Sequence, residues 1–261
     1  MKRGAVLLIA VGLSACATNV PRYSQPFERQ VREAANPSTL VAREIAYARA
    51  AREDGQWTAM RRYAADGAVV HAGSGPMSVR QFLSAAGANP DVPNQWTPLS
   101  VHMSCDGGTA VTRGKYRDAE GGWGYYATVW ERDSNYDYHF VYDIAAPDAE
   151  LTERENRAAR APVEDDGSIV VEAVPSIRGI VSECDLADSL PEQFAAAAQQ
   201  DGGRDRIAVA SDDTLAWEWR HAPDGKRGFS AWIIESGAWV EAVRLDADAD
   251  GRHIPVPRSR P

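Results

Sequence analysis

The sequence lacks an apolar run of membrane-spanning length, has only three cysteines, and shows no excess of basic residues. A transmembrane helix needs about 20 apolar residues, and the apolar stretch at residues 5–13 is roughly half as long. The 37 acidic residues outnumber the 28 basic ones, which gives a formal net charge of −9. Because nucleic-acid binding needs a basic surface, no nucleic-acid partner is predicted.

The signatures of common metal-binding and enzyme classes are also missing. There is no Cys-x-x-Cys pair, no paired histidines, no phosphate loop, no nucleophile elbow and no dinucleotide-binding glycine pattern. We therefore predict neither a metal nor a cofactor. The hydrophobic fraction of 44% and the charged fraction of 25% are ordinary for a globular protein. A chain of 261 residues can form one large domain or two small ones.

The N-terminus has the pattern of an export signal. Lys2 and Arg3 precede nine apolar residues, and the stretch ends in Leu13-Ser14-Ala15-Cys16. These four residues resemble the bacterial lipobox, in which the cysteine receives diacylglycerol and becomes the new N-terminus. The resemblance implies a signal peptide over residues 1–15 and lipidation of Cys16. The alternatives are an ordinary signal peptide with an unrelated cysteine, or a buried apolar strand.

The residues after Cys16 predict where the protein resides. Ala17 follows the cysteine in place of Asp, and in bacterial lipoproteins this implies transport to the outer membrane. Residues 16–37 contain three prolines among polar residues, which is typical of a tether. We therefore expect an acidic body in the periplasm, held at the outer membrane by lipid on Cys16.

The two other cysteines fit an oxidising compartment. Cys105 and Cys184 each lie beside an acidic residue in a turn-like sequence, so neither is typical of a core position. An even number of cysteines outside the cytoplasm favours a disulfide between them. Two free thiols are the alternative.

Residues 38–146 predict an α+β domain in which helices precede strands. A helix begins near Pro37 and ends at Asp54-Gly55, a second follows to about residue 66, and a third covers residues 79–83. A short strand at residues 68–71 separates the last two. Aromatic and β-branched runs then predict three antiparallel strands, at residues 109–116, 125–132 and 138–144. We expect the helices to cover one face of this sheet.

Several short motifs of this region are similar to a known family. They are Asp54-Gly55-Gln56-Trp57, Tyr63-Ala64-Ala65-Asp66-Gly67-Ala68-Val69, Trp96-Thr97-Pro98, Ser104-Cys105-Asp106-Gly107, residues 124–132 and Val141-Tyr142-Asp143. Their order and spacing resemble the nuclear transport factor 2-like superfamily, in particular its SnoaL-like and ketosteroid-isomerase-like bacterial members. The resemblance implies a cone-shaped curved antiparallel sheet on three helices, with a cavity at its wide end. It also implies that the sheet can carry a homodimer.

The C-terminal part predicts a second, smaller α+β domain. Residues 147–166 are rich in charge and are expected to be a linker or an exposed helix. Residues 167–248 contain strand-like runs at 169–173 and 177–181 and a short helix from about residue 190. An antiparallel meander of three strands follows, at residues 207–220, 229–235 and 238–245. The tail at residues 249–261 has no periodicity and is expected to be mobile, and its acids to be solvated rather than bound to calcium.

The predicted meander partly repeats the first one. Three sequence features, Glu120-Gly121, Gly124-Tyr125 and Glu131, have counterparts 104 residues later at Asp224-Gly225, Gly228-Phe229 and Glu235. Internal duplication is one explanation, and two independent hairpins of similar length are the other.

Candidate site residues come from strand alternation and from the resemblance. On the last strand, Tyr138, Phe140 and Tyr142 are predicted to share one face and His139, Val141 and Asp143 the other. Tyr126, Thr128 and Trp130 are predicted to share a face of the preceding strand. The candidate pocket residues are Trp57, Tyr63, His71, Tyr126, Trp130 and Asp143. The alternative is that the aromatic residues belong to the core and that His71 is an ordinary polar residue.

Together these observations favour a lipid-anchored envelope protein with a non-catalytic domain that binds a small apolar molecule or a protein. A general acid–base enzyme of the SnoaL-like kind (an isomerase, cyclase or hydrolase) is the first alternative, because such enzymes place titratable groups in an apolar cavity. A structural factor in envelope assembly is the second alternative. Resemblance in fold does not choose among them.

Overall fold

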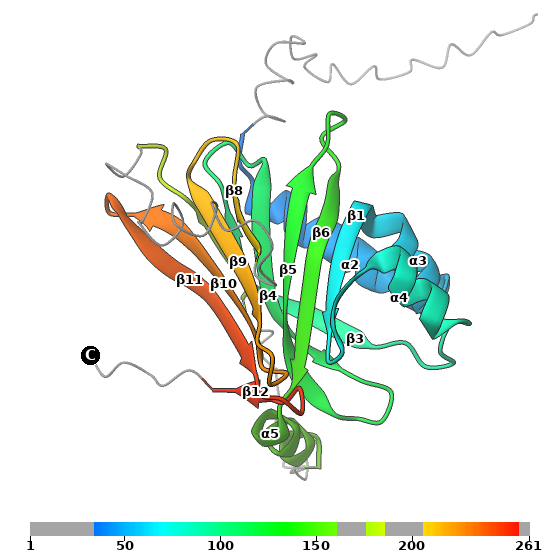
Figure 1. Ribbon diagram of the computed structural model, residues 1–261. Coiled ribbons are helices and arrows are strands. Elements are labelled where there is room, and N and C mark those ends of the chain that lie inside the picture. The colour runs from blue at the N-terminus through cyan, green and yellow to red at the C-terminus, as the bar shows by residue number, and fades with distance from the viewer. Residues whose placement is uncertain (1–33, 161–175, 186–205, 256–261) are drawn as a thin grey trace, which may run out of the picture.

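The computed structural model describes residues 34–160, 176–185 and 206–255 of the chain. These residues form an α+β fold, as the sequence predicts. A mixed seven-stranded sheet carries helices on one face and packs its other face against a five-stranded antiparallel sheet (Figure 1). None of the helices among the described residues is both long and apolar enough to cross a membrane.

Two of the three helices on the first sheet begin at residues whose side chains cap them. The side chain of Asn36 accepts a hydrogen bond from the backbone N–H of Ser38, and Pro37 suits a helix start because its missing N–H would be unpaired there. Ser78 and Gln81 form a capping box at the start of the third helix. The three helices are α2 (Pro37–Glu53), α3 (Gln56–Tyr63) and α4 (Val79–Ala86).

The first sheet has the strand order β2-β1-β6-β5-β4-β3-β7. Its strands are β1 (Ala64–Ala72), β2 (Gly75–Ser78), β3 (Gln95–Met103), β4 (Thr109–Arg117), β5 (Trp123–Arg132), β6 (Tyr138–Pro147) and β7 (Arg178–Val181). The prediction of a purely antiparallel sheet is wrong, because β1 pairs in parallel with β6 and β7 pairs in parallel with β3. Parallel neighbours need long crossover connections, and these strands are far apart in the sequence.

Two features of this sheet were not expected from the sequence. The strand β3 contains Pro98, which cannot donate a ladder hydrogen bond, and the register shifts immediately after this residue. The strand β7 was assigned to the C-terminal domain, from residue 167 onward, yet it is an edge strand of the first sheet. Residues 169–173 and the predicted helix from residue 190 lie outside the described residues.

Helix α5 (Ala149–Arg160) occupies most of the segment predicted as a linker or exposed helix. The side chain of Asp148 accepts a hydrogen bond from the backbone N–H of Leu151 at its start, and Leu151 is buried. The second sheet follows, with strands in the order β12-β11-β10-β9-β8. They are β8 (Arg206–Val209), β9 (Leu215–His221), β10 (Arg227–Glu235), β11 (Ala238–Ala247) and β12 (His253–Ile254).

The structure corrects two expectations about this second sheet. Residues 207–220 form two strands in place of one, because a turn at residues 211–214 with Asp213 at φ 57° reverses the chain. Residues 253 and 254 pair with β11, and the side chain of His253 is nearly buried against Asp148. This part of the tail is therefore ordered, contrary to the prediction.

The two meanders have matching turns. In the first, the N–H groups of Asp118 and Gly121 bond to the carbonyls of Gly122 and Asp118. In the second, 104 residues later, the N–H groups of Ala222 and Gly225 bond to the carbonyls of Lys226 and Ala222. The same pair of bonds also occurs at residues 133–137 and at residues 248–252, so it does not choose between internal duplication and independent hairpins.

The disulfide predicted between Cys105 and Cys184 is present, with Cα atoms 5.2 Å apart. It joins the β3–β4 turn to the residues that follow β7. Hydrogen bonds next to it, from Cys105 N–H to Thr214 Oγ1 and from Glu183 N–H to the carbonyl of Ile234, connect both partners to the second sheet. The crosslink therefore lies where the two sheets meet.

Candidate functional site

A cavity of about 180 Å³ lies between the helices and the first sheet. Its described lining comes from α2, α3 and strands β3 to β6, and consists of Glu44, Tyr47, Gln56, Met60, Asn94, Trp96, Tyr116, Tyr126, Thr128, Asp143 and Ala145. Asn94, Trp96 and Tyr116 are partly exposed, whereas Glu44 and Tyr126 are buried. The cavity therefore leads from a partly exposed aromatic rim to a buried carboxyl group.

Glu44 provides the buried carboxyl group, with 1% of its surface exposed. The hydroxyl of Tyr126 donates a hydrogen bond of 2.6 Å to its Oε1 atom, while Oε2 has no hydrogen-bond partner among the described residues. Burial raises the pKa of Glu44 to about 7, against the lowering effect of the Tyr126 hydrogen bond, and the negative charge of Asp143 adds to the rise. Glu44 therefore exchanges its proton near neutral pH.

Asp143 is the second carboxyl group of the cavity. Burial raises its pKa to about 6, although the hydroxyl of Thr128 donates a 2.6 Å hydrogen bond to Oδ1 and acts in the opposite direction. The two carboxyl groups thus belong to different elements, α2 and β6, and both have pKa values above the ordinary range of acids.

A β-bulge determines which way Asp143 points. Trp130 pairs with Phe140 and Val129 pairs with Tyr142, so Val141 is an extra residue on β6. Phe140 packs on the helix side of the sheet, whereas Tyr142 packs against the second sheet. The prediction that these two share a face is therefore wrong, because alternation does not continue through a bulge.

The same bulge separates His139 from Asp143. Asp143 pairs with Thr128 on the cavity side of the sheet, and Val141 packs with the cluster between the sheets. His139 instead lies 3.6 Å from Asp133 near the β5–β6 turn. The prediction of a common face for His139, Val141 and Asp143 is therefore also wrong.

The cavity wall is aromatic. Tyr47 of α2 stacks on Tyr63 with ring centroids 4.8 Å apart, and it contacts the ring of Trp96 at the same separation. Trp130 meets Tyr47 edge-on at 6.3 Å and donates a hydrogen bond to Thr112. Tyr63 and Trp130 therefore support the wall from behind without lining the cavity.

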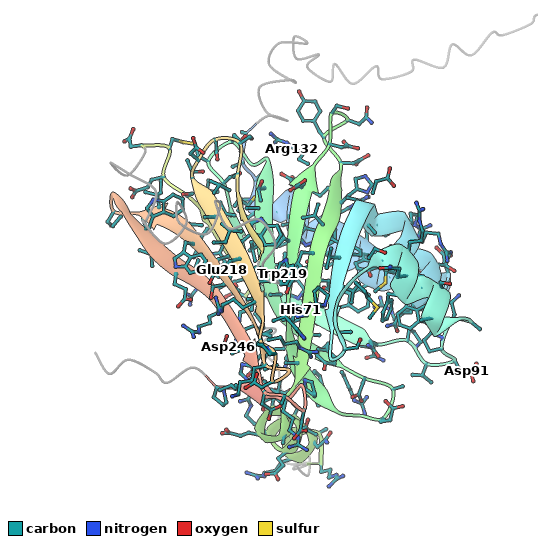
Figure 2. All side chains as sticks on the ribbon, viewed as in Figure 1. His71, Asp91, Arg132, Glu218, Trp219 and Asp246 are labelled. Carbon is teal, nitrogen blue, oxygen red and sulfur yellow. A yellow bond between two sulfur atoms is a disulfide. The ribbon has the colours of Figure 1, made fainter. Side chains whose placement is uncertain are left out.

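Of the six candidate pocket residues, the structure brings Tyr126 and Asp143 together at the cavity. Trp57 packs edge-on against Phe82 outside it, with centroids 5.2 Å apart. His71 lies on the opposite face of the sheet, beside Trp219 of the second sheet (Figure 2). It belongs to the contact between the sheets.

The surroundings of His71 keep it neutral. Its Nδ1 atom is 2.7 Å from the hydroxyl of Tyr142, and its Nε2 atom is 3.0 Å from Nδ1 of His221. Burial lowers the pKa of His71 to about 3, and the positive charges of Arg227 and His221 contribute. This histidine therefore makes a buried polar contact between the two sheets.

Glu44 was not found from the sequence, although a signal for it exists. It follows Leu40 by four residues and precedes Ala48 by four, so it occupies the inner face of a helix whose neighbours on that face are apolar. An acidic residue between two such positions is unusual in a core. Ile45, the next residue on the helix, is 48% exposed.

A larger groove of about 640 Å³ lies on the surface between α3, β1 and α4. Its titratable lining residues, Arg61, Asp66 and Arg80, are all exposed. Solvent therefore screens their charges. The smaller cavity is the better candidate site because it holds buried groups that can exchange protons.

The chain matches no protein-family model, and no curated protein matches it. The site must therefore be interpreted from its own chemistry. The part of the chain that the structure describes has no cluster of three or more His, Cys, Asp or Glu side chains suited to a metal ion. The cavity offers two carboxyl groups that titrate near neutral pH, a protonated tyrosine and aromatic walls.

Proposed function

We propose that the cavity binds a small molecule, and that the protein performs this role at the cell envelope. The observation that carries the proposal is Glu44, a buried carboxyl group that lines a cavity and has one oxygen without a partner among the described residues. Leaving such an atom unpaired is costly unless a ligand or water satisfies it. The volume of 180 Å³ favours a ligand smaller than those of ordinary drug-sized pockets, which measure about 300–1,000 Å³.

Ligand-observed NMR with a library of molecules of up to about ten non-hydrogen atoms tests this function. Ala145 lines the cavity, so Ala145→Leu should fill the space and abolish the binding of molecules that bind the original chain. Ala42→Leu is the matched control, since Ala42 is exposed on α2. Molecules that bind both variants equally well occupy another site, and a library without a single cavity ligand would contradict the proposal.

General acid–base catalysis on the bound molecule is the second candidate. The pKa values of Glu44, about 7, and Asp143, about 6, favour it, because a catalytic acid or base works best near the ambient pH. A carbon-acid probe such as cyclopentanone distinguishes catalysis from binding. An acid–base site should speed the exchange of the α-protons of cyclopentanone in D₂O, and Glu44→Gln should remove this effect. If the protein does not alter the exchange rate, the site binds without catalysing.

Envelope localisation by a lipid on Cys16 is also our proposal, and it rests on the lipobox-like residues 13–16. An acidic chain gains little from anionic headgroups, so acyl chains would have to hold it at the membrane. Cys16→Ser should move the protein from the membrane fraction to the soluble periplasm. Membrane association that persists in this variant, or an N-terminus without fatty acid, would refute the proposal.

The resemblance to the nuclear transport factor 2-like superfamily supports the position of the site. In that superfamily the cavity lies between helices and a curved sheet, as the cavity does here. The homodimer that the resemblance implies would need a free face of the sheet, and in this chain the second sheet covers the face opposite the helices. We therefore propose that the described part acts without a partner on this face.

Docking of a protein has less support than binding of a small molecule. The large apolar side chains exposed on the described surface lie on separate elements, namely Ile45, Val92, Val181, Val240 and Ile254. Isolated apolar residues of this kind are normal on soluble proteins. A role in envelope assembly has little support for the same reason, because it would also need a continuous apolar surface.

A further inference from the structure

The carboxyl groups at the inner end of the cavity are a buried one, Glu44, and a partly buried one, Asp143. Glu44 accepts a hydrogen bond from Tyr126 at Oε1, and its Oε2 atom has no partner among the residues described. Asp143 receives a side-chain bond from Thr128 at Oδ1. A molecule that brings hydrogen-bond donors would satisfy the remaining acceptor positions.

No cationic side chain among the described residues that line the cavity balances these two carboxyl groups. The described lining of the cavity contains no lysine, arginine or histidine. Arg43, one residue before Glu44, instead places its guanidinium over the ring of Tyr63 and donates to the carbonyl of Tyr138. A positive charge would therefore have to come from the ligand.

The walls suit a cation as well. Tyr47, Trp96, Tyr116 and Tyr126 line the cavity, and the face of an aromatic ring carries partial negative charge. A carboxylate shielded from water and the face of an aromatic ring are the two features that recognise an organic ammonium group. Both attract a cation more strongly where water is excluded.

We propose that the cavity selects small organic cations that carry a primary ammonium group, which bonds to Glu44 and Asp143 while its carbon chain contacts the aromatic rim. This inference rests on the proposed binding function and names its ligand class. Binding of the cation displaces any proton that the carboxyl groups hold, and this proton passes to the solvent. No covalent bond forms or breaks.

The titratable groups that face the cavity determine how binding depends on pH. They are Glu44 and Tyr47 from α2, Tyr116 from β4, Tyr126 from β5 and Asp143 from β6. Burial raises the pKa of all three tyrosines, so they stay neutral between pH 5 and 8, and only the carboxyl groups titrate there. Affinity for an ammonium ion should therefore rise with pH through this range.

Isothermal titration calorimetry of the full-length chain in detergent tests the proposal with three probes of similar size: n-butylammonium, 1-butanol and butyrate. At pH 8 the ammonium probe should bind about tenfold to a hundredfold more tightly than the alcohol, and butyrate should not bind detectably. Binding of the ammonium should release protons near pH 6, which makes the observed heat depend on the ionisation enthalpy of the buffer.

Glu44→Gln and Asp143→Asn remove one charge each at nearly constant shape. Each substitution should lower the affinity for n-butylammonium at least about tenfold, while the affinity for 1-butanol changes little. Glu53→Gln is the matched control, because Glu53 lies exposed on the same helix. It should leave all three affinities unchanged.

The outcomes separate this inference from the proposed function. If 1-butanol binds the cavity as tightly as n-butylammonium, and neither depends on pH, the cation class is wrong while the binding function stands. If none of the three probes binds, the inference is again overturned. The wider library with the Ala145→Leu variant then decides whether the binding function fails too.

Discussion

The hydroxyl of Tyr126 donates a 2.6 Å hydrogen bond to Oε1 of Glu44, and this bond joins strand β5 to helix α2 at the buried end of the cavity. Burial and the nearby negative charge of Glu44 raise the pKa of Tyr126 well above its usual range. The phenol therefore remains a donor at all relevant pH values. The bond both holds the helix against the sheet and determines how readily Glu44 ionises.

Tyr126→Phe should raise the pKa of Glu44 above its present value of about 7. The hydrogen bond from the Tyr126 hydroxyl favours the charged carboxylate and so lowers the pKa of Glu44. Without this bond, the effect of burial, which raises the pKa, is opposed less strongly. Carbon-13 NMR of the carboxyl resonance, followed over a pH titration, measures this shift. Tyr125→Phe is the control, because Tyr125 points to the other face of β5, and it should leave the titration unchanged.

Glu44→Gln should change how the stability of the fold depends on pH. The pKa of Glu44 is about 7 in the folded chain against 4.5 for the free side chain, so the folded state favours the protonated form. Stability from this group is present below pH 4.5 and is lost as the pH rises to about 7. The loss is about 3 kcal/mol, and the glutamine variant should not show it.

Urea unfolding at several pH values measures this difference in the free energy of unfolding. Buried His71 acts in the opposite direction, since its pKa is lowered to about 3 and its contribution is lost as the pH falls below 6.5. The comparison must therefore be made between variants at each pH. Glu53→Gln should follow the original chain, and an identical profile for Glu44→Gln would show that Glu44 is ionised at neutral pH.

The sequence predicts the local features of this fold well. Asn36 as a cap before Pro37 marks the start of α2, and turn residues between the aromatic runs mark the strands β4, β5 and β6. These features depend on residues close together in the chain, so propensity and capping are sufficient to locate them. The disulfide was likewise predictable from the number of cysteines and the expected compartment.

The candidate site was only half predictable. Tyr126 and Asp143 were named, but Asp143 reaches the cavity because Val141 is bulged, and nothing in the alternation of residues signals this bulge. Glu44 was missed because an acid on a helix is ordinarily solvated, although its spacing from Leu40 and Ala48 places it on the inner face of α2. The parallel pairing of β7 with β3 depends on contacts between distant segments and could not be inferred locally.

Gly114→Ala should disturb the cavity through the side chain of Tyr126. A Cβ atom at Gly114 would lie 2.4 Å from the carbonyl oxygen of Thr97 and 2.4 Å from the ring of Tyr126. Both contacts are closer than a Cβ atom tolerates, so β3 and the ring of Tyr126 must both move, at a cost of about 1–3 kcal/mol in stability. The pKa of Glu44 should rise as its hydrogen bond weakens.

Gly73→Ala is the control for that substitution, because its nearest neighbour, an Arg227 nitrogen, would be 3.5 Å from the new atom. Urea unfolding and the carboxyl titration together give the two readouts. A Gly114→Ala variant with unchanged stability would mean that the strands separate more easily than the structure indicates. Lower stability with an unchanged Glu44 titration would mean that the carbonyl, and not Tyr126, absorbs the change.

Reduction of the disulfide between Cys105 and Cys184 should destabilise the whole chain and release β7 first. The crosslink closes a loop across 79 residues, which corresponds to about 4 kcal/mol in the chain-entropy treatment. The strand β7 has four residues, and its only paired neighbour in the described sheet is β3. Cys184, three residues beyond it, is therefore an important restraint on its position.

Hydrogen exchange distinguishes local release from global loss of stability. Without the crosslink, amide protection in β7 should fall more than protection in β5, which lies between two strands in the sheet. The double variant Cys105→Ala, Cys184→Ala should behave like the reduced chain, which excludes an effect of the reductant elsewhere. Equal urea midpoints with and without reductant would mean that the hydrogen bonds from Cys105 to Thr214 and from Glu183 to Ile234 are sufficient to hold this junction of the two sheets.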